Sequence, residues 1–217
     1  MLDTDLYFAC IDLRGRRALV VGGGPAAAEK ADALCLSRAE VLVVAERAGE
    51  RIQELHAEGK LRWEARSYET SDLDGCLLAI AAAEDRRTNE RVFAEADERA
   101  MLVNVVDVPE LCNFISPAIA RRGPVAIAVT TSGASPALAQ RVRREIEGTV
   151  DESYGTLARL LDAERAWART NLPDYDDRKR FFSAIVSGHP DPISLLRDGD
   201  EAGVARLIET AKSEALR

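Results

Sequence analysis

The sequence contains few of the residues that build metal and nucleophile sites. Among its 217 residues there are two histidines, His56 and His189, and no two cysteines stand in a CxxC pair. This scarcity argues against a cysteine/histidine zinc site, a disulfide framework and a serine–histidine–aspartate arrangement. We therefore predict no metal site. The cysteines lie in apolar contexts, so we expect buried, small hydrophobic side chains. They are Cys10, Cys35, Cys76 and Cys112.

Positive charge and long apolar runs are also scarce. The formal net charge is −8, which argues against binding to nucleic acid or to an anionic membrane. No run is long and apolar enough to span a bilayer, and the first residues lack the basic-then-apolar pattern of a secretory signal. We expect a cytoplasmic protein with no nucleic-acid and no membrane partner. The hydrophobic content of 47% suffices for one sizeable core, or for a core with a smaller attached domain.

Short apolar runs alternate with helical segments in the first half of the chain. Runs such as CLLAIAA at 76–82 are typical of parallel strands covered on both faces. This alternation predicts an α/β fold with a doubly wound parallel sheet. We expect strands at 18–21, 40–45, 61–68, 76–82 and 102–106, with helices at 26–36, 52–58 and 85–99.

A glycine-rich stretch, VVGGGPAAAEKADAL, joins the first expected strand to the first expected helix. Glycine lets the backbone approach a pyrophosphate closely, and the start of a helix supplies unpaired N–H groups. In the GxGxxG register, Gly22 and Gly24 take the first two glycine positions, and Ala27 takes the third. The stretch predicts a Rossmann-type dinucleotide-binding unit, although a tight turn in an ordinary α/β protein is an alternative.

An acidic residue is expected about 20 residues after the glycines, where it would bind the ribose hydroxyls of the dinucleotide. Glu46 stands near this spacing, at the end of the second expected strand. An acid at this point disfavours a 2′-phosphate, so it favours NAD over NADP as the cofactor. The neighbouring Arg47 weakens that preference.

Four prolines break the segment after Asp107 into short pieces, in which we expect a strand at 125–130 and a helix at 134–147. From Glu152 onward the chain is charged and helical. We therefore predict three domains. They are an NAD-binding domain at 1–112, a dimerisation and linking segment at 113–150, and a helical domain at 151–217.

Asp107 is a candidate general base. It follows the apolar run LVNVV, at the edge of the sheet where ligands of open α/β proteins bind. A carboxylate there can take up a proton while NAD accepts a hydride. The alternative is that Asp107 caps a turn before Pro109. Asn104 and Ser116 lie beside the same expected cleft.

The segment from Leu111 to Arg144 contains no aspartate or glutamate, in a chain that has 37 of them. A cationic lining of this kind would suit a substrate rich in carboxylates. Alternatively, these arginines form a solvated face or pair with acids elsewhere. The hydroxyl-rich loop TTSGASP enters a helix through Ser135 and Pro136, where Ser135 is expected to cap the helix. The arginines of this segment are Arg121, Arg122, Arg141, Arg143 and Arg144.

Three stretches, in order along nearly the whole chain, carry a family resemblance together with the helical tail. They are VVGGGPAAAEKADAL, DGCLLAIAAAEDRRTNERV and NVVDVPELCNFISPAIARRGPVAIAVTTSGASPALAQRVRREIE. The chain resembles the precorrin-2 dehydrogenase / sirohydrochlorin ferrochelatase family, which also forms the N-terminal module of siroheme synthases. The resemblance implies NAD-dependent oxidation of precorrin-2 to sirohydrochlorin, and in some members insertion of ferrous iron. It also implies a homodimer paired through its central segment, with the helical tail helping to form the tetrapyrrole cleft.

The resemblance implies roles for individual residues. Asp107 matches the catalytic aspartate, and Glu46 and Arg47 fall where the family contacts the adenosine end of NAD. Thr131 stands where the fused enzymes have a serine that can be phosphorylated. The implied phosphate loop consists of Gly22, Gly23, Gly24, Pro25 and Ala26. The expected substrate contacts are Asn104, Ser116, Arg121, Thr131, Ser132, Gly133 and Arg141.

The chain departs from the family pattern near the catalytic motif. Val108 and Asn113 stand where many members have aspartate. Two alternatives to a simple dehydrogenase stay open on the sequence. The first is a bifunctional enzyme that also inserts ferrous iron, and the second is an NAD-binding regulatory module without turnover.

Overall fold

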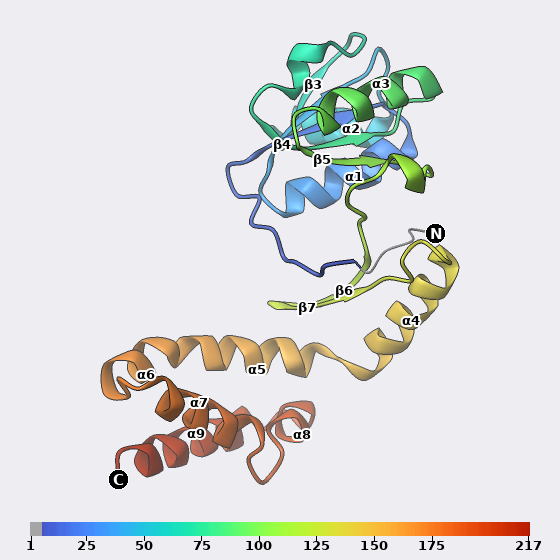
Figure 1. The fold of residues 1–217 in the computed structure, drawn as a ribbon. Helices are drawn as coiled ribbons and strands as arrows, with labels where there is room; N and C mark the ends of the chain where they lie inside the picture. Colours follow the sequence, from blue (N-terminus) through green and yellow to red (C-terminus); the bar gives the residue numbers. More distant parts are fainter. Residues whose placement is uncertain (1–5) are drawn as a thin grey trace. The chain divides into compact units, whose positions relative to one another are not determined.

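The computed structural model describes residues 6–217, which divide into two compact units (Figure 1). The first unit runs through Ser116 and also takes in Ser132–Ala134. The second contains Pro117–Thr131 and Ser135–Arg217. The predicted division into three domains stays a prediction, because compactness does not by itself define a functional domain.

The first unit is built on a parallel sheet of five strands in the order β3-β2-β1-β4-β5. The chain moves outward from β1 to β3 and then returns to the other side of β1 to form β4, so the order reverses between β1 and β4. Ligands of open α/β sheets bind at such a switch point. The predicted doubly wound parallel sheet is confirmed. The strands are β1 (Arg17–Val21), β2 (Glu40–Val44), β3 (Arg62–Glu64), β4 (Cys76–Ala81) and β5 (Leu102–Val105).

Helices cover both faces of this sheet. On one face, α1 (Pro25–Leu36) and α2 (Glu50–Ala57) pack against alternate strand residues such as Val20 and Val43. On the other face, α3 (Arg86–Asp97) packs against residues such as Leu19. A strand covered on both faces must be apolar at consecutive positions, which is why the central strands are continuous apolar runs. Two short 3-10 helices, η1 (Thr70–Leu73) and η2 (Pro109–Leu111), follow β3 and β5.

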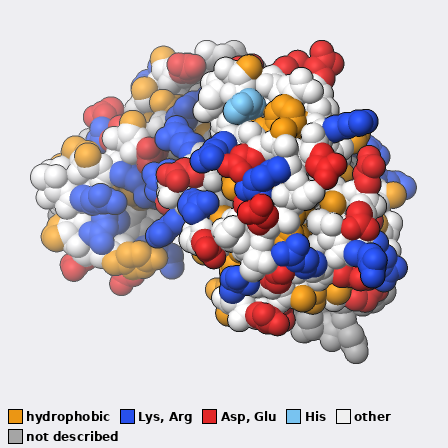
Figure 2. Space-filling view, turned by 90° about the horizontal axis from the view of Figure 1, so that it is seen from above, with side chains coloured by type: hydrophobic (Ala, Val, Ile, Leu, Met, Phe, Trp, Pro, Cys, Tyr) orange, Lys and Arg blue, Asp and Glu red, His pale blue; other side chains and the backbone are white. Residues whose placement is uncertain are grey.

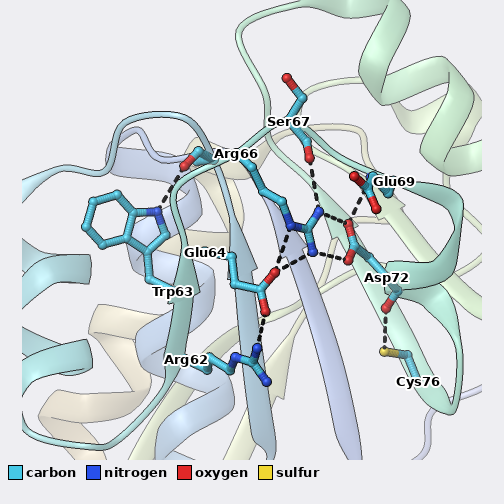
Figure 3. A network of polar contacts seen from close by, with 9 residues as sticks. Arg62, Trp63, Glu64, Arg66, Ser67, Glu69, Asp72 and Cys76 are labelled. Carbon is cyan, nitrogen blue, oxygen red and sulfur yellow. Dashed lines mark hydrogen bonds and ion pairs between the residues drawn. The ribbon is translucent and has the colours of Figure 1, made fainter.

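The expected strand at 61–68 is mostly wrong, because β3 ends at Glu64. Arg66 turns back, with its backbone N–H bonded to the Glu64 carbonyl at 3.0 Å. Its guanidinium then donates two hydrogen bonds to the buried carboxylate of Asp72, at 2.6 and 2.9 Å (Figure 3). The same carboxylate accepts the Glu69 backbone N–H at 2.9 Å. This network holds the chain away from the sheet. The pattern of residue types in the sequence does not predict it.

The Asp72–Arg66 pair should give the fold a dependence on acid pH. Burial opposes ionisation of Asp72, but hydrogen bonds from Arg66 and from the Glu69 N–H outweigh it and lower the pKa of the carboxyl below its ordinary value. The stabilisation is therefore complete above the unfolded-state pKa of about 3.9 and is lost as the pH falls through the lower folded-state pKa. We expect Asp72→Asn to lower the free energy of unfolding by about 1–3 kcal/mol at pH 7.

Urea unfolding at pH 7 and at pH 3 checks this expectation. The difference in unfolding free energy between the wild type and Asp72→Asn should shrink at pH 3. Asp74→Asn removes an exposed carboxylate beside the same turn and serves as the matched control. An equal loss of stability in both variants at pH 7 would show that the buried Asp72–Arg66 pair adds no more stability than an exposed carboxylate does.

The second unit begins with an antiparallel hairpin of β6 (Ala118–Arg122) and β7 (Val125–Val129). The strand expected at 125–130 is present, but its partner β6 was not predicted, because AIARR is short and ends in two charged residues. Gly123 turns the hairpin with a φ of +56°. The hairpin packs against α4 (Pro136–Thr149), which Ser135 caps by accepting the Leu138 N–H at 3.2 Å.

Five further helices complete the second unit. Their shared core contains Leu157 of α5, Phe181 and Ile185 of α7, and Val204 and Ile208 of α9. Apolar side chains from helices far apart in the chain thus form a core of their own, without any part of the sheet. The helices are α5 (Glu152–Ala163), α6 (Arg165–Asn171), α7 (Tyr175–Val186), α8 (Pro192–Arg197) and α9 (Glu201–Ala215).

Charged side chains of both signs are mixed over the face shown in Figure 2. Ion pairs one helical turn apart recur in both units, such as Arg86–Glu90 at 2.7 Å and Arg141–Glu145 at 2.9 Å. Exposed pairs of this kind contribute little to stability. Within residues 6–217, none of the helices has the length and apolar character needed to cross a bilayer.

Candidate functional site

The first unit contains a cavity of about 690 Å³ at the carboxyl edge of its sheet. Loops that follow β1, β2 and β4 form its walls, so it lies at the switch point of the sheet. The segment after β3 completes it. The lining residues are Val21–Gly24, Val44–Gly49, Arg66–Tyr68, Ala83–Asp85 and Thr88.

The three glycines after β1 have different surroundings. Gly22 has a φ of +125°, and a Cβ built on it would lie 2.2 Å from the Ala82 carbonyl oxygen. A Cβ on Gly23 would lie 1.9 Å from the carbonyl oxygen of Arg47, whereas a Cβ on Gly24 would meet nothing within 4 Å. The first two glycines therefore let the loops after β1, β2 and β4 pack together. The third borders the open cavity.

Helix α1 starts directly at this opening. Its N-cap is Gly24, which supplies no side-chain oxygen, and Pro25 occupies the first turn. The N–H groups of a helix start that lacks a side-chain cap are donors for an anion, and the helix dipole favours negative charge there. Ala27, at the third fingerprint position, is fully buried, because the helix packs closely on the sheet. This geometry fits a dinucleotide pyrophosphate.

The loop after β2 brings one acid and one arginine to the cavity wall. Glu46 is exposed and accepts a hydrogen bond from the hydroxyl of Ser67 at 2.7 Å. Ser67 follows Arg66, whose guanidinium is held by Asp72, so an ordered segment orients the Glu46 carboxylate. The sequence offered no signal for Ser67, since it lies 21 residues from Glu46 in the chain.

Asp107 lies on the turn after β5, the strand that pairs with β4. It is exposed and has a φ of +62°. Aspartate is one of the few residues other than glycine that tolerate this left-handed conformation. Its side chain has no hydrogen bond or ion pair within residues 6–217. An exposed carboxylate on strained backbone at the ligand edge of a sheet is a candidate catalytic group.

Cys112 holds the turn that carries Asp107, a role that the sequence did not reveal. Its sulfur accepts the Val105 backbone N–H at 3.3 Å and lies 3.3 Å from the carbonyl oxygens of Val105 and Val108. Burial raises the pKa of the Cys112 thiol, so it stays protonated at neutral pH and can donate to one of these carbonyls. The expectation of buried cysteines is wrong for Cys10, which is exposed, and Cys35, Cys76 and Cys112 are only partly buried. For Cys112 the expectation of a small hydrophobic side chain is also incomplete, because its partners are backbone groups invisible in the sequence.

Two of the expected substrate contacts in the first unit differ in their surroundings. The buried amide of Asn104 donates to the Phe114 carbonyl at 3.0 Å and approaches the Cys112 sulfur at 3.4 Å. It therefore supports the segment after Asp107. Ser116 is exposed at the end of the first unit. Their roles toward substrate stay predictions.

Three of the remaining expected substrate contacts, Thr131, Ser132 and Gly133, lie in one loop that is closed by hydrogen bonds. The Thr131 hydroxyl accepts the Ser135 N–H at 2.9 Å and lies 3.1 Å from its carbonyl oxygen. Ser132 and Gly133, between them, have positive φ angles of +51° and +83°. Thr131 thus shapes the loop, and its role toward substrate, like those of Ser132 and Gly133, stays a prediction.

The arginines of the acid-free segment are only partly paired. Arg141 and Arg143 form ion pairs with Glu145 and Glu147, at 2.9 and 2.5 Å. Arg122 donates to the Glu147 carbonyl at 3.0 Å. These pairs agree in part with the alternative in which the arginines meet acids elsewhere. Arg121 is exposed, and its side chain has no hydrogen bond or ion pair in the part of the chain that the structure describes.

The described residues contain no cluster of three or more histidine, cysteine, aspartate or glutamate side chains that could hold a metal ion.

A glycine turn and the open start of α1, at the switch point of a parallel sheet, define a Rossmann-type dinucleotide-binding protein. Comparison with family models agrees with this class. A model described as "Putative NAD(P)-binding" matches residues 9–118, about half of the chain. The models "Sirohaem biosynthesis protein central" and "Sirohaem synthase dimerisation region" match residues 122–149 and 153–211. The chain belongs to this NAD(P)-binding family, and the predicted nicotinamide dinucleotide cofactor is confirmed.

Similar proteins carry related names. The siroheme synthase of Thioalkalivibrio sulfidiphilus is 36% identical over 98% of this chain, and that of Azotobacter vinelandii is 42% identical over 91%. The chain spans 43% and 42% of the length of these two relatives. A solved structure, "SirC, precorrin-2 dehydrogenase", has a TM-score of 0.78 and 27% identity, covering 94% of this chain and 100% of that one. The family resemblance stated from the sequence is confirmed.

Proposed function

We propose that this chain is an NAD-dependent dehydrogenase that oxidises precorrin-2 to sirohydrochlorin, with Asp107 as the general base. The observation that carries the proposal is the arrangement of one sheet edge. The cavity follows β1, β2 and β4, and the exposed Asp107 follows β5, which pairs directly with β4. The likeness to a solved precorrin-2 dehydrogenase over its whole length supports the choice of substrate.

The residues present fit a dinucleotide. The N–H groups after Gly24 would hold the pyrophosphate, with Gly22 and Gly23 keeping the loop close to its neighbours. Glu46 and Arg47 would contact the adenosine end, as the family resemblance implies. NAD, when bound, supplies a hydride acceptor. The carboxylate of Asp107 takes up the proton that the oxidation releases, and its exposure lets it pass that proton to solvent.

Glu46 should determine the preference for NAD over NADP. Its carboxylate repels a 2′-phosphate, whereas Arg47, in the same cavity wall, would attract one. We expect Glu46→Ala to lower the ratio of NAD affinity to NADP affinity by about 10-fold or more. Titration calorimetry with each nucleotide measures this ratio.

Glu84 provides the matched control, because it also lines the cavity but belongs to the loop after β4. Glu84→Ala removes the same charge and should leave the ratio unchanged. If both variants shift the ratio equally, the total charge of the cavity sets the preference for NAD, and the position of Glu46 does not matter.

The partners and the location form part of the proposal. The match of residues 153–211 to a dimerisation region supports a homodimer. A cytoplasmic location, expected from the sequence, stays a prediction.

Anaerobic incubation of the purified chain with freshly generated precorrin-2 and NAD tests the function. Formation of the sirohydrochlorin spectrum that requires NAD supports the dehydrogenase. If the chain binds NAD but the spectrum does not change, the proposal is wrong and a regulatory module becomes the better explanation. Addition of ferrous iron to the product then distinguishes the bifunctional enzyme from a simple dehydrogenase. The bifunctional enzyme requires iron insertion faster than the uncatalysed reaction.

A further inference from the structure

The segment that follows β3 holds Ser67 in one place on the wall of the dinucleotide cavity. Its neighbour Arg66 donates to the Glu64 carboxylate at 2.8 Å and to the two oxygens of Asp72 at 2.6 and 2.9 Å (Figure 3). The same guanidinium donates to the Ser67 backbone carbonyl at 3.0 Å. The backbone of Ser67 is therefore anchored on its N-terminal side.

The residue on the other side, Tyr68, is anchored as well. Its ring is buried, and its hydroxyl donates to the Glu95 carboxylate of α3 at 2.7 Å. That carboxylate also accepts from Arg91 at 2.7 Å and from Thr70 at 3.1 Å. Because both neighbours of Ser67 are anchored, its exposed side chain has a defined position in the cavity wall.

The same segment holds the backbone next to Glu46. The Ala45 N–H donates to the Glu64 carbonyl at 3.2 Å, and the indole N–H of Trp63 donates to the Ala45 carbonyl at 3.0 Å. These bonds fix where the Glu46 side chain begins. They do not fix where its carboxylate points, because the side chain is exposed and its torsions can rotate.

The Ser67 hydroxyl supplies the missing constraint. Within residues 6–217, the one hydrogen bond to the Glu46 carboxylate comes from this hydroxyl, which donates to Oε1 at 2.7 Å. The other oxygen, Oε2, is left to accept a hydrogen bond from a ligand in the cavity. A carboxylate oriented before binding costs less conformational entropy when the ligand arrives.

The network also keeps a cation from acting in the site. Arg66 lines the cavity, but its guanidinium is held between the carboxylates of Glu64 and Asp72. Two carboxylates offset its charge, so it offers little attraction to a 2′-phosphate. The orientation of Glu46 therefore matters more than Arg66 for distinguishing NAD from NADP.

We propose that Ser67 is a positioning residue that makes this cavity select NAD. Its hydroxyl holds one oxygen of the Glu46 carboxylate and leaves the other to accept from the 2′-hydroxyl of the adenosine ribose. It also keeps the negative charge where the 2′-phosphate of NADP would have to lie. The inference rests on the part of the proposed function that places the adenosine end at Glu46, and it needs neither precorrin-2 nor Asp107.

Titration calorimetry of Ser67→Ala with NAD and with NADP tests the inference. Without the hydroxyl, the Glu46 carboxylate has to be ordered when NAD binds, so we expect NAD affinity to fall about threefold to tenfold. NADP affinity should stay the same or rise, because the carboxylate can turn away from the 2′-phosphate. Ser67→Thr keeps the hydroxyl and should keep the preference for NAD.

Two controls separate this role from a general effect on the segment. Ser71 is an exposed serine in η1 that does not line the cavity, so Ser71→Ala should bind both nucleotides as the wild type does. An NAD analogue whose adenosine ribose lacks the 2′-hydroxyl cannot donate to Glu46. Its affinity should therefore be the same for the wild type and Ser67→Ala. Thermal unfolding establishes that all variants are folded.

A Glu46→Ala background distinguishes positioning from direct contact with the nucleotide. In that background Ser67→Ala should have no further effect on NAD affinity. A wild-type ratio of NAD to NADP affinity in Ser67→Ala, or an equal loss of NAD affinity in both backgrounds, would overturn the inference. These affinities are measured without precorrin-2. A chain that shows the expected ratios but no NAD-dependent oxidation would thus contradict only the proposed function.

Discussion

Asp107→Asn is expected to lower the rate of NAD-dependent precorrin-2 oxidation by about 10²–10⁴-fold and to leave NAD affinity unchanged. The reason is that the amide cannot accept the released proton, while the dinucleotide cavity is lined by other residues. Asparagine also tolerates a left-handed backbone, so the φ of +62° can persist and the turn can keep its shape. The substitution therefore separates the charge of the residue from the strain of its backbone.

Single-turnover spectra under anaerobic conditions measure the rate, and calorimetry measures NAD binding. Glu110→Gln is the matched control, because Glu110 is an exposed acid three residues further on, in η2. It should retain wild-type activity. Full activity in Asp107→Asn would agree with a dehydrogenase but would show that Asp107 is not its general base. The role of the aspartate would then be to shape the turn.

Gly23→Ala is expected to lower the free energy of unfolding by about 2–3 kcal/mol and to abolish NAD binding. Its Cβ would lie 1.9 Å from the Arg47 carbonyl oxygen, so the loops after β1 and β2 must separate. That movement would also strain the hydrogen bond from the Gly49 N–H to the Gly23 carbonyl, now 2.8 Å long. The added methyl group would thus displace both the loop after β1 and the loop after β2, which form two walls of the cavity.

Gly24→Ala supplies the contrast, since its Cβ would meet nothing within 4 Å. We expect its stability to stay within about 1 kcal/mol of the wild type. Its methyl group would nevertheless stand where the pyrophosphate is proposed to lie, so NAD affinity should fall about tenfold or more. Urea unfolding and calorimetry measure both quantities. Wild-type stability in Gly23→Ala would contradict the described loop packing, and wild-type NAD affinity in Gly24→Ala would contradict the pyrophosphate position.

The candidate site was only partly predictable. The glycine loop and Glu46 could be found because the fingerprint spacing is short and local, and the structure brings both to one cavity. Ser67, which orients Glu46, could not be found because the contact joins segments that no pattern relates. Cys112 was expected to be a plain buried side chain, since its hydrogen bonds to backbone groups depend on how the segment after Asp107 folds back onto β5.

The sequence by itself determined the parallel sheet, its helices and the class of cofactor. Continuous apolar strands, helix-favouring composition and a glycine turn depend on neighbouring residues, so local physics is enough to encode them. Only the tertiary structure decided that the chain leaves the sheet after Glu64, that β6 pairs with β7, and that the Ser67 hydroxyl reaches the Glu46 carboxylate. Those features depend on contacts between separate segments, whose burial and hydrogen bonding outweigh local preference.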